Sequence, residues 1–317
     1  MEAPPQALEL IKYVVSKIGA ALRQGDLAEF GLQGQEQALV DRELVSRSVY
    51  LGLNEQYRAF LMLAYDRTGI DPAILAAMIN IEAYPLPAVG AAAQAQRYAR
   101  ADSLFWKNHP GETPHALTKA DPKEWAAEWK TIHETYTHEW NPTSENPGTH
   151  ALGLAQFMAA TWVGQGEKSG TYLNEYAKAN GYLGNDGKIL KDKKADFLAL
   201  RTDAKLSIVA MAEFGKSHLE ALAKADLPAT TPEQEARYLY IAHHDGVRSP
   251  EDEAGRAVEL ISRHLPEEEA AEKLSKNLDG QPYQAYVNGH GGTAEAAYYH
   301  RVYTELAGSM NPSAFRT

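Results

Sequence analysis

The stretch that decides the fold lies early in the chain and reads Ile70-Asp71-Pro72-Ala73-Ile74-Leu75-Ala76-Ala77-Met78-Ile79-Asn80-Ile81-Glu82. It begins with a helix start, because the acidic Asp71 caps free backbone N–H groups and Pro72 suits the first helical position. Apolar residues then dominate, until Pro85 and Pro87 end the helix. The pattern predicts an apolar helix that ends on the carboxylate of Glu82.

Most other periodic stretches also predict helices, and none alternates in the two-residue period that a confident sheet requires. Asn54 has the position of an N-cap for a helix at 55–68, and Gly69 has that of its C-terminal stop. Asp186-Gly187 suits the turn of one small hairpin at 182–190. Further helices are expected at 7–22, 91–107, 123–136, from 202–203 to 225, from 231–232 towards 246, from 249–250, from 265–266, and from 293 to 306. The expected fold class is mainly α.

The composition excludes several classes of protein. The 317 residues include 31 Lys and Arg against 42 Asp and Glu, which gives a formal net charge of −11, and there is no Cys. Without Cys the chain has no disulfide scaffold, no Cys-ligated zinc and no thiol nucleophile. The acidic balance is the opposite of what phosphate binding requires, so we expect no nucleic-acid partner. The start Met1-Glu2-Ala3-Pro4-Pro5 does not resemble a secretory signal peptide, and no apolar run reaches membrane-spanning length, so we expect neither feature.

A second informative stretch offers groups that suit a binding site, and it reads Ala151-Leu152-Gly153-Leu154-Ala155-Gln156-Phe157-Met158-Ala159-Ala160-Thr161-Trp162. Gly153 permits a close backbone approach, and the amide of Gln156 carries both a donor and an acceptor. Phe157 and Trp162 supply apolar faces. From its spacing alone, the stretch is either the start of an ordinary helix or part of a functional site.

The pattern Gly-Leu-Ala-Gln-Phe-Met-x-x-Thr-Trp at 153–162 resembles the second motif of the soluble lytic transglycosylase and goose-type lysozyme superfamily. Residues 70–82 are similar to its first motif, a Glu at the end of an apolar helix. Residues 238–246 stand where the third motif lies, in a form similar to phage-type relatives, and residues 198–208 resemble the helix that braces the substrate groove. The resemblance covers about 54–265 and implies a lysozyme-like helical domain that cleaves the β-1,4 linkage between N-acetylmuramic acid and N-acetylglucosamine in peptidoglycan.

The resemblance also implies roles for individual residues. Glu82 would be the general acid, and Gln156 would orient an N-acetyl group or a peptide carbonyl of the substrate. His243 and His244 stand where the superfamily places Tyr and Asn, and they would line the groove. The implied substrate-binding residues are Gln156, Phe157, Thr161, Tyr240, His243 and His244.

The same resemblance suggests how the chain is organised. Residues 1–50 would be an N-terminal helical extension, 51–265 the catalytic domain, and 266–317 a C-terminal helical extension. Within the catalytic domain, residues 84–140 form an excess over the usual spacing between the first two motifs and would be an insertion or lid. The expected architecture is a lysozyme-like helical domain with this large insertion and extra helices at both ends.

The chain departs from the superfamily pattern beside its candidate acid. Ala83 follows Glu82 where members usually have Ser. Asn141-Pro142 resembles an Asn-Pro that normally follows the acid closely, so Glu139 is a rival for that role. The apolar helix before Glu82 fits the first motif better, and we therefore favour Glu82.

The route of cleavage depends on a second carboxylate. An inverting hydrolase places a general base roughly 6.5–9.5 Å from the acid, whereas a covalent mechanism requires about 5–5.5 Å. Lytic transglycosylases need neither, because a hydroxyl of the substrate closes an anhydro ring. Lysozyme-type hydrolysis is slightly favoured, transglycosylation and a non-catalytic peptidoglycan-binding module remain alternatives, and the possible bases are Asp102, Glu139, Glu145 and Asp245.

Metal and cofactor patterns are weak in this sequence. His133 and His138 are five residues apart, which places them about 140° apart around an α-helix, so they do not form the zinc pair of a metalloprotease helix. No glycine-rich phosphate loop follows a strand, and no Gly-x-Ser-x-Gly elbow is present. We expect no metal and no cofactor.

The expected partner is the glycan strand of peptidoglycan. An enzyme of this type without a signal peptide would act in the bacterial cell wall or periplasm after delivery by a phage or a dedicated secretion system. Delivery machinery and an immunity protein that blocks the groove are therefore possible further partners.

Overall fold

The computed structural model describes residues 34–87, 92–93, 95–97, 99–100, 137–247, 255–278 and 280–316. The chain divides into two compact units, Met1–Ser48 and Val49–Thr317, and helix α2 (Gly34–Ser48) is the described element of the first. Outside the described residues lie Asp102, the predicted helices at 7–22 and 123–136, most of the one at 91–107, and the helix start at 249–250.

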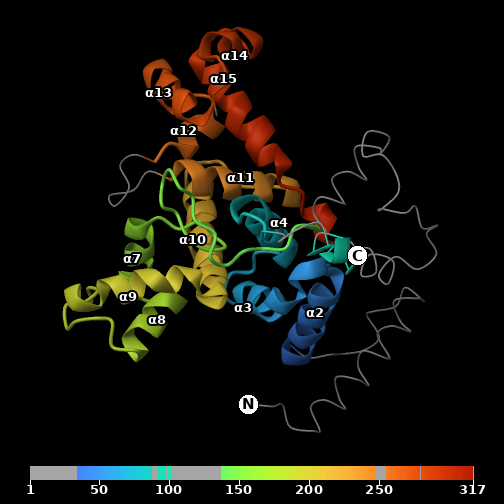
Figure 1. Cartoon of the computed structure of the whole chain (residues 1–317), viewed down its shortest axis with the longest axis vertical. Coiled ribbons are helices and arrows are strands. Elements are labelled where there is room, and N and C mark those ends of the chain that lie inside the picture. The colour runs from blue at the N-terminus through green and yellow to red at the C-terminus, as the bar shows by residue number, and fades with distance from the viewer. Residues whose placement is uncertain are drawn as a thin grey trace. The chain divides into compact units, whose positions relative to one another are not determined.

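The second unit consists of helices joined by loops (Figure 1). Its α-helices are α3 (Arg58–Thr68), α4 (Pro72–Glu82), α7 (Ala159–Glu167), α8 (Tyr172–Ala179), α9 (Lys194–Ala199), α10 (Ala204–Lys224), α11 (Pro232–Asp245), α12 (Ala257–Ile261), α13 (Glu267–Asn277), α14 (Tyr283–Gly289) and α15 (Ala294–Tyr299). Its 3-10 helices are η2 (Gly52–Tyr57), η3 (Lys191–Lys193), η4 (Leu200–Thr202), η6 (Ala307–Ser309) and η7 (Pro312–Phe315), and η5 (His300–Leu306) is a π-helix.

The prediction of a mainly α fold is confirmed, since the described residues form no sheet and only isolated β-bridges. One bridge, between Leu183 and Ile189, closes the turn predicted at 182–190. Gly187 supplies the left-handed backbone of this turn with a φ of 75°. Among the described helices, none is both long and apolar enough to cross a membrane.

Helix α4 is buried because its side chains are apolar nearly all the way round, as Ile74, Leu75 and Met78 illustrate with no exposed area. It packs against α3, α11 and η7. The longest helix, α10, packs against α3, α8 and α11 (Figure 1). Because α4 and α11 are in contact, the residues at their ends can meet although about 160 positions separate them in the sequence.

Four of the helix starts predicted from the sequence are confirmed by side-chain caps. Asp71 accepts a hydrogen bond from the backbone N–H of Ala73 at the start of α4. Asp203, Thr231 and Thr293 cap α10, α11 and α15 in the same way. These caps depend on residues two or three positions apart, which is why local sequence was enough to find them.

The predicted role of Asn54 as an N-cap is wrong. Asn54 lies inside η2, and its buried side chain reaches across the chain to residues 138–140. Its Nδ2 donates to the carbonyl of His138 at 2.8 Å, and its Oδ1 accepts from the backbone N–H of Trp140 at 2.8 Å. The Asn54 amide therefore holds residues 138–140 against η2 and does not cap a helix. The prediction for Gly69 is confirmed, because it ends α3 with a φ of 78°.

The two ends of the segment 84–140 lie side by side. The backbone N–H of Leu86 donates to the carbonyl of Glu139 at 2.8 Å, and that of Asn141 donates to the carbonyl of Tyr84 at 3.2 Å. The indole Nε1 of Trp140 donates to Asn80 Oδ1 at 3.1 Å, which ties this pairing to α4. The described ends of this segment therefore meet next to the C-terminal end of α4.

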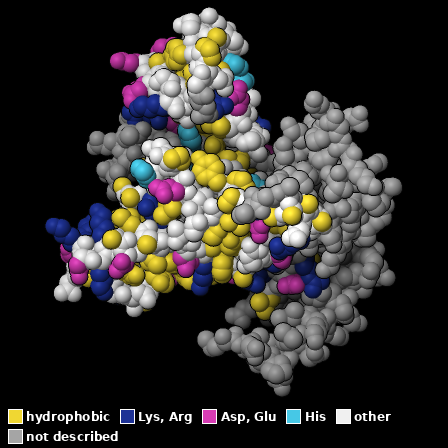
Figure 2. All heavy atoms as spheres, in the orientation of Figure 1, with side chains coloured by type: hydrophobic (Ala, Val, Ile, Leu, Met, Phe, Trp, Pro, Cys, Tyr) yellow, Lys and Arg dark blue, Asp and Glu magenta, His cyan; other side chains and the backbone are white. Residues whose placement is uncertain are grey.

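The surface of the unit carries an apolar region. Figure 2 shows hydrophobic side chains gathered near the middle of the displayed face, in the region of α4 and α11, with most charged side chains nearer the edges. Among the large hydrophobic residues, Tyr84 is 48 % exposed and Met158 is 46 % exposed. Tyr84 follows Glu82 by two positions, and Met158 follows Phe157 directly.

Candidate active site

Glu82 is the last residue of α4 and is half-buried. Within the described part of the chain its carboxylate makes neither a hydrogen bond nor an ion pair, but its charge acts on Tyr240, His243 and His244 of α11. The contact between α4 and α11 thus brings the predicted acid together with three predicted substrate-binding residues.

The loop that carries Gly153 is fixed by a close approach to Arg201. A Cβ at Gly153 would lie 2.0 Å from the carbonyl oxygen of Arg201, so only glycine fits, and its φ of 86° requires glycine as well. The Arg201 guanidinium donates to the carbonyls of His150 at 3.1 Å and Phe157 at 2.9 Å. The hydroxyl of Ser207 accepts from the backbone N–H of Ala155 at 3.2 Å. This packing places Phe157 against α11.

Gln156 uses its amide mainly to hold this loop. Its Nε2 donates to the carbonyl of Ser144 at 3.1 Å, to the hydroxyl of Ser144 at 2.9 Å and to the carbonyl of Gly153 at 2.8 Å. Its backbone adopts a left-handed φ of 47°, which is uncommon for a residue other than glycine. The buried Oε1 has no hydrogen-bond partner in the described structure and is the amide atom left for another donor.

Phe157 lies in the core, with 1 % of its area exposed. Its ring meets the edge of the His243 ring at a centroid distance of 6.1 Å and packs on Trp162 at 5.3 Å. Its contribution is therefore to support His243. Thr161 is half-buried in the first turn of α7, and within the described structure it makes no hydrogen bond with Glu82 or α11.

The two histidines of α11 differ in their electrostatic surroundings. Burial lowers the pKa of His243, and the charge of Glu82 with a hydrogen bond to the backbone of Ala155 offsets this only in part. Burial would lower the pKa of His244 too, but its hydrogen bond to Asp245 and the charges of Asp245 and Glu82 outweigh burial and raise it. Near neutral pH, His243 is therefore neutral, while His244 keeps its proton to higher pH than an ordinary imidazole.

Tyr240 lies beside His244, with the two rings stacked at a centroid distance of 6.0 Å. Burial raises the pKa of the Tyr240 hydroxyl well above its usual range, and the charge of Glu82 adds to this. The hydroxyl therefore stays protonated and keeps its hydrogen for donation.

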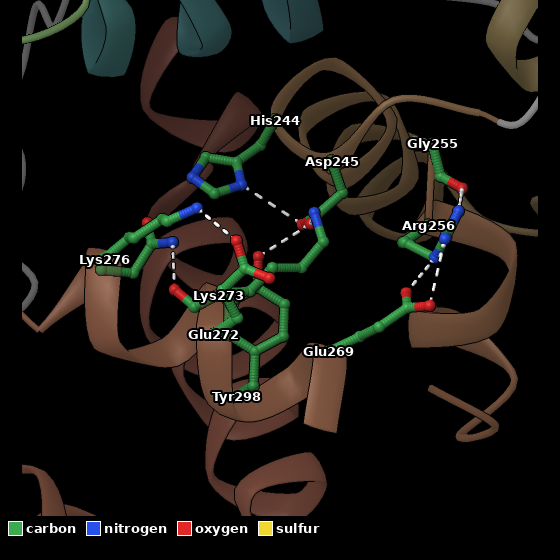
Figure 3. Close-up of polar contacts among 10 residues, drawn as sticks. His244, Asp245, Gly255, Arg256, Glu269, Glu272, Lys273, Lys276 and Tyr298 are labelled. Carbon is green, nitrogen blue, oxygen red and sulfur yellow. Dashed lines mark hydrogen bonds and ion pairs between the residues drawn. The ribbon is translucent and has the colours of Figure 1, made fainter. Parts of the chain in front are cut away.

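Asp245, one of the possible bases, is a buried anchor with no exposed side-chain area (Figure 3). Its Oδ1 accepts from Lys273 Nζ at 2.8 Å and from the Tyr298 hydroxyl at 2.7 Å, and its Oδ2 lies 3.2 Å from His244 Nδ1. Burial would raise the pKa of Asp245, but its hydrogen bonds with His244 and Lys273 and their charges lower it. The carboxylate has no free face for a substrate, and it holds His244 in place.

The other possible carboxylates already have partners where they are described. Glu139 lies between Arg97, at 3.5 Å, and Arg100, at 4.0 Å. Glu145 pairs with His150 at 2.9 Å. Asp102 lies outside the described residues.

Sequence reasoning missed three residues that shape this site. Lys273 and Tyr298 anchor Asp245 from positions 28 and 53 residues away, and no local pattern signals such a contact. His218 of α10 packs on Phe214 at a centroid distance of 4.1 Å, and its buried Nδ1 has no hydrogen-bond partner in the described structure. The one signal in the sequence that could have indicated His218 is an isolated histidine among the apolar residues of its helix.

His218 is expected to make the fold sensitive to acid. Burial lowers its pKa from 6.5 to about 3, with smaller contributions from His243 and Lys168. As the pH falls, His218 therefore binds a proton in the unfolded chain before it does so in the folded chain, and this favours unfolding. The stability contributed by neutral, buried His218 is complete above about pH 6.5 and is lost progressively towards about pH 3. We expect it to lower the free energy of unfolding by about 2 kcal/mol between about pH 7 and about pH 5.

His218→Met removes the titrating group while filling a similar volume, so its free energy of unfolding should fall less over this interval. Urea unfolding at both pH values measures the difference. The exposed His264, changed to Met, is the matched control and should behave as the wild type does. An equal acid response in all three proteins would contradict the assignment.

Comparison with known proteins adds no family assignment: no family model, no curated protein and no solved structure matches this chain.

Proposed function

We propose that this chain is a peptidoglycan glycosidase that cleaves the β-1,4 linkage between N-acetylmuramic acid and N-acetylglucosamine. One observation supports it above all: three segments distant in sequence meet around His243. The charge of Glu82 acts on His243 and His244, and Phe157 packs on His243. These segments carry the three motifs on which the resemblance to lysozymes and lytic transglycosylases depends.

In the proposed reaction, the carboxylic acid of Glu82 donates its proton to the glycosidic oxygen as the C1–O bond breaks. The bond's electron pair leaves with that oxygen, and positive charge develops on the sugar ring. The proton held by His244 then stabilises the Glu82 carboxylate that remains. Asp245 keeps His244 oriented and charged for this task.

The nucleophile that completes the reaction distinguishes two routes. In hydrolysis, a base takes a proton from water, which attacks C1. In transglycosylation, the C6 hydroxyl of N-acetylmuramic acid attacks C1, and its proton passes to the Glu82 carboxylate. Hydrolysis, which the sequence slightly favours, requires a second carboxylate, and in the described structure Glu139 lies beside two arginines and Glu145 beside His150. Transglycosylation requires no second carboxylate, so the products decide between the two routes.

Incubation with purified peptidoglycan sacculi tests the proposal, with mass spectrometry of the soluble muropeptides as the readout. Products with an anhydro end identify a transglycosylase, and products that have gained water identify a lysozyme. Either product supports the glycosidase. If the protein sediments with sacculi but releases no fragment, the proposal fails and the alternative of a non-catalytic peptidoglycan-binding module replaces it.

The proposed substrate sets the place of action. An enzyme for glycan strands works in the bacterial cell wall or periplasm, and we propose that a phage or a dedicated secretion system delivers it there. The glycan strand is the proposed partner, and delivery machinery or an immunity protein would be a further one.

A further inference from the structure

A second group of chemically active side chains lies in the C-terminal helices, apart from the residues around Glu82. His290 follows α14 directly, and His300 and Glu305 belong to η5. Their nitrogen and carboxylate oxygen atoms all lie within 4.8 Å of one another, and all three residues are half-buried. Figure 2 shows histidine and acidic side chains together at the surface in the region of α14 and α15.

The π-helix brings His300 and Glu305 to the same side. Residues five positions apart diverge by about 140° around an α-helix. In a π-helix the backbone hydrogen bond itself joins positions five apart, so the side chains at these positions lie close together. His300 Nδ1 accordingly lies 3.4 Å from Glu305 Oε1. Such π turns are frequent at functional sites, and this one pairs an imidazole with a carboxylate.

A backbone hydrogen bond fixes which nitrogen of His290 can act as a metal ligand. Its Nδ1 lies 2.9 Å from the carbonyl oxygen of Tyr286, and a carbonyl only accepts, so Nδ1 carries the hydrogen. The lone pair is then on Nε2. A backbone carbonyl that holds the other ring nitrogen of a histidine is the usual support of a metal ligand.

Arg301 forms an ion pair with the carboxylate oxygen of Glu305 that does not face His300. Arg301 Nη1 lies 2.8 Å from Glu305 Oε2, and its Nε donates to the carbonyl of Asn277 at 3.0 Å. Glu305 Oε1 is the oxygen that faces His300. The rings of His290 and His300 stack with centroids 4.1 Å apart, and a tetrahedral zinc site requires the three ligand atoms to close from within 4.8 Å of one another to roughly 3.3 Å.

We propose that His290, His300 and Glu305 form a binding site for Zn²⁺. Two imidazole nitrogens and one carboxylate oxygen are a donor set that zinc accepts with a fourth position left for water, whereas Ca²⁺ and Mg²⁺ prefer oxygen ligands alone. The ion joins the end of α14 to η5, and it stabilises the folded chain because the unfolded chain lacks the assembled site. The proposal is independent of the function proposed for Glu82.

The test uses the full chain, freed of metal with a chelator that is then removed. Competition with a chromophoric chelator measures Zn²⁺ affinity and stoichiometry, and thermal unfolding with and without Zn²⁺ gives the second readout. We expect the wild type to bind one Zn²⁺ ion tightly per chain and to unfold at a higher temperature with Zn²⁺ than without it. The Zn²⁺ affinity of His290→Gln and of His300→Gln should be lower than that of the wild type by about 100-fold or more. Glu305→Gln, which keeps the shape of the side chain, should weaken binding as well.

His264→Gln is the control, because His264 is an exposed histidine outside this group. This variant should still bind one Zn²⁺ ion per chain as tightly as the wild type does. Circular dichroism of each metal-free variant establishes that it is folded before binding is compared. The proposal is overturned if the wild type binds no Zn²⁺ tightly, or if folded His290→Gln and His300→Gln both keep wild-type affinity.

Discussion

Glu82→Gln is expected to clear peptidoglycan sacculi about 10²–10⁴-fold more slowly than the wild type, the range typical of a lost general acid. Glutamine keeps the size of the side chain but has no acidic proton to give to the glycosidic oxygen. Glu82 makes no hydrogen bond or ion pair within the described structure, so the substitution should leave the fold unchanged. Loss of turbidity of a sacculus suspension gives the rate, and thermal unfolding gives the stability.

Two further variants make this result specific. Glu220 is exposed on α10 and has no role in the proposed chemistry, so Glu220→Gln removes the same charge and should clear sacculi at the wild-type rate. Glu139→Gln tests the rival acid. If Glu139→Gln loses the activity and Glu82→Gln keeps it, Glu82 is not the acid and the mechanism must be rebuilt around Glu139.

Lys273→Met is expected to lower the free energy of unfolding by about 3 kcal/mol. Asp245 has no exposed side-chain area, and Lys273 and His244 are the two basic side chains paired with its carboxylate. Removing the ammonium leaves a buried charge with only His244 and the Tyr298 hydroxyl to stabilise it, and a buried carboxylate that loses a partner is costly. Urea unfolding near neutral pH measures the change.

The same helix provides a matched control. Lys276 pairs with Glu272 at 2.6 Å, but both side chains are 69 % exposed, so water already solvates the pair (Figure 3). Lys276→Met should leave the unfolding midpoint nearly unchanged. Adding Asp245→Asn to Lys273→Met should recover part of the loss, because the uncompensated charge is then gone. Equal stability of the two lysine variants would show that Asp245 does not depend on Lys273.

Local sequence signals predicted α4, α10, α11, α13 and α15, because the interactions that start and stop a helix join residues a few positions apart, but they did not predict α2, α7, α8, α9, α12 and α14. Asp71, Asp203, Thr231 and Thr293 all cap the helices that were expected after them. The same rule failed at Asn54. An asparagine side chain that can cap a helix can equally well make buried hydrogen bonds to a distant segment. Here the hydrogen-bond partners of Asn54 lie 84 and 86 residues away.

The candidate site was predictable only in part. The apolar helix and the motif resemblance singled out Glu82, Gln156, His243 and His244, but they treated Gln156 as a substrate ligand, whereas its Nε2 braces its own loop. Asp245 was considered as a base because its type is suitable. Its burial between Lys273, Tyr298 and His244 makes it an anchor, and no pattern within one segment reveals that.

The sequence by itself determined that the chain is mainly helical, where α4, α10, α11, α13 and α15 begin, and that an apolar helix ends on Glu82, because periodicity and capping act within a few turns of backbone. Only the tertiary structure decided which residues meet Glu82, which carboxylates are already paired, and that His300 and Glu305 share one side of a π-helix. The physical reason is that charge pairing, burial and unusual helix geometry depend on which segments pack together, and packing joins residues far apart in the chain.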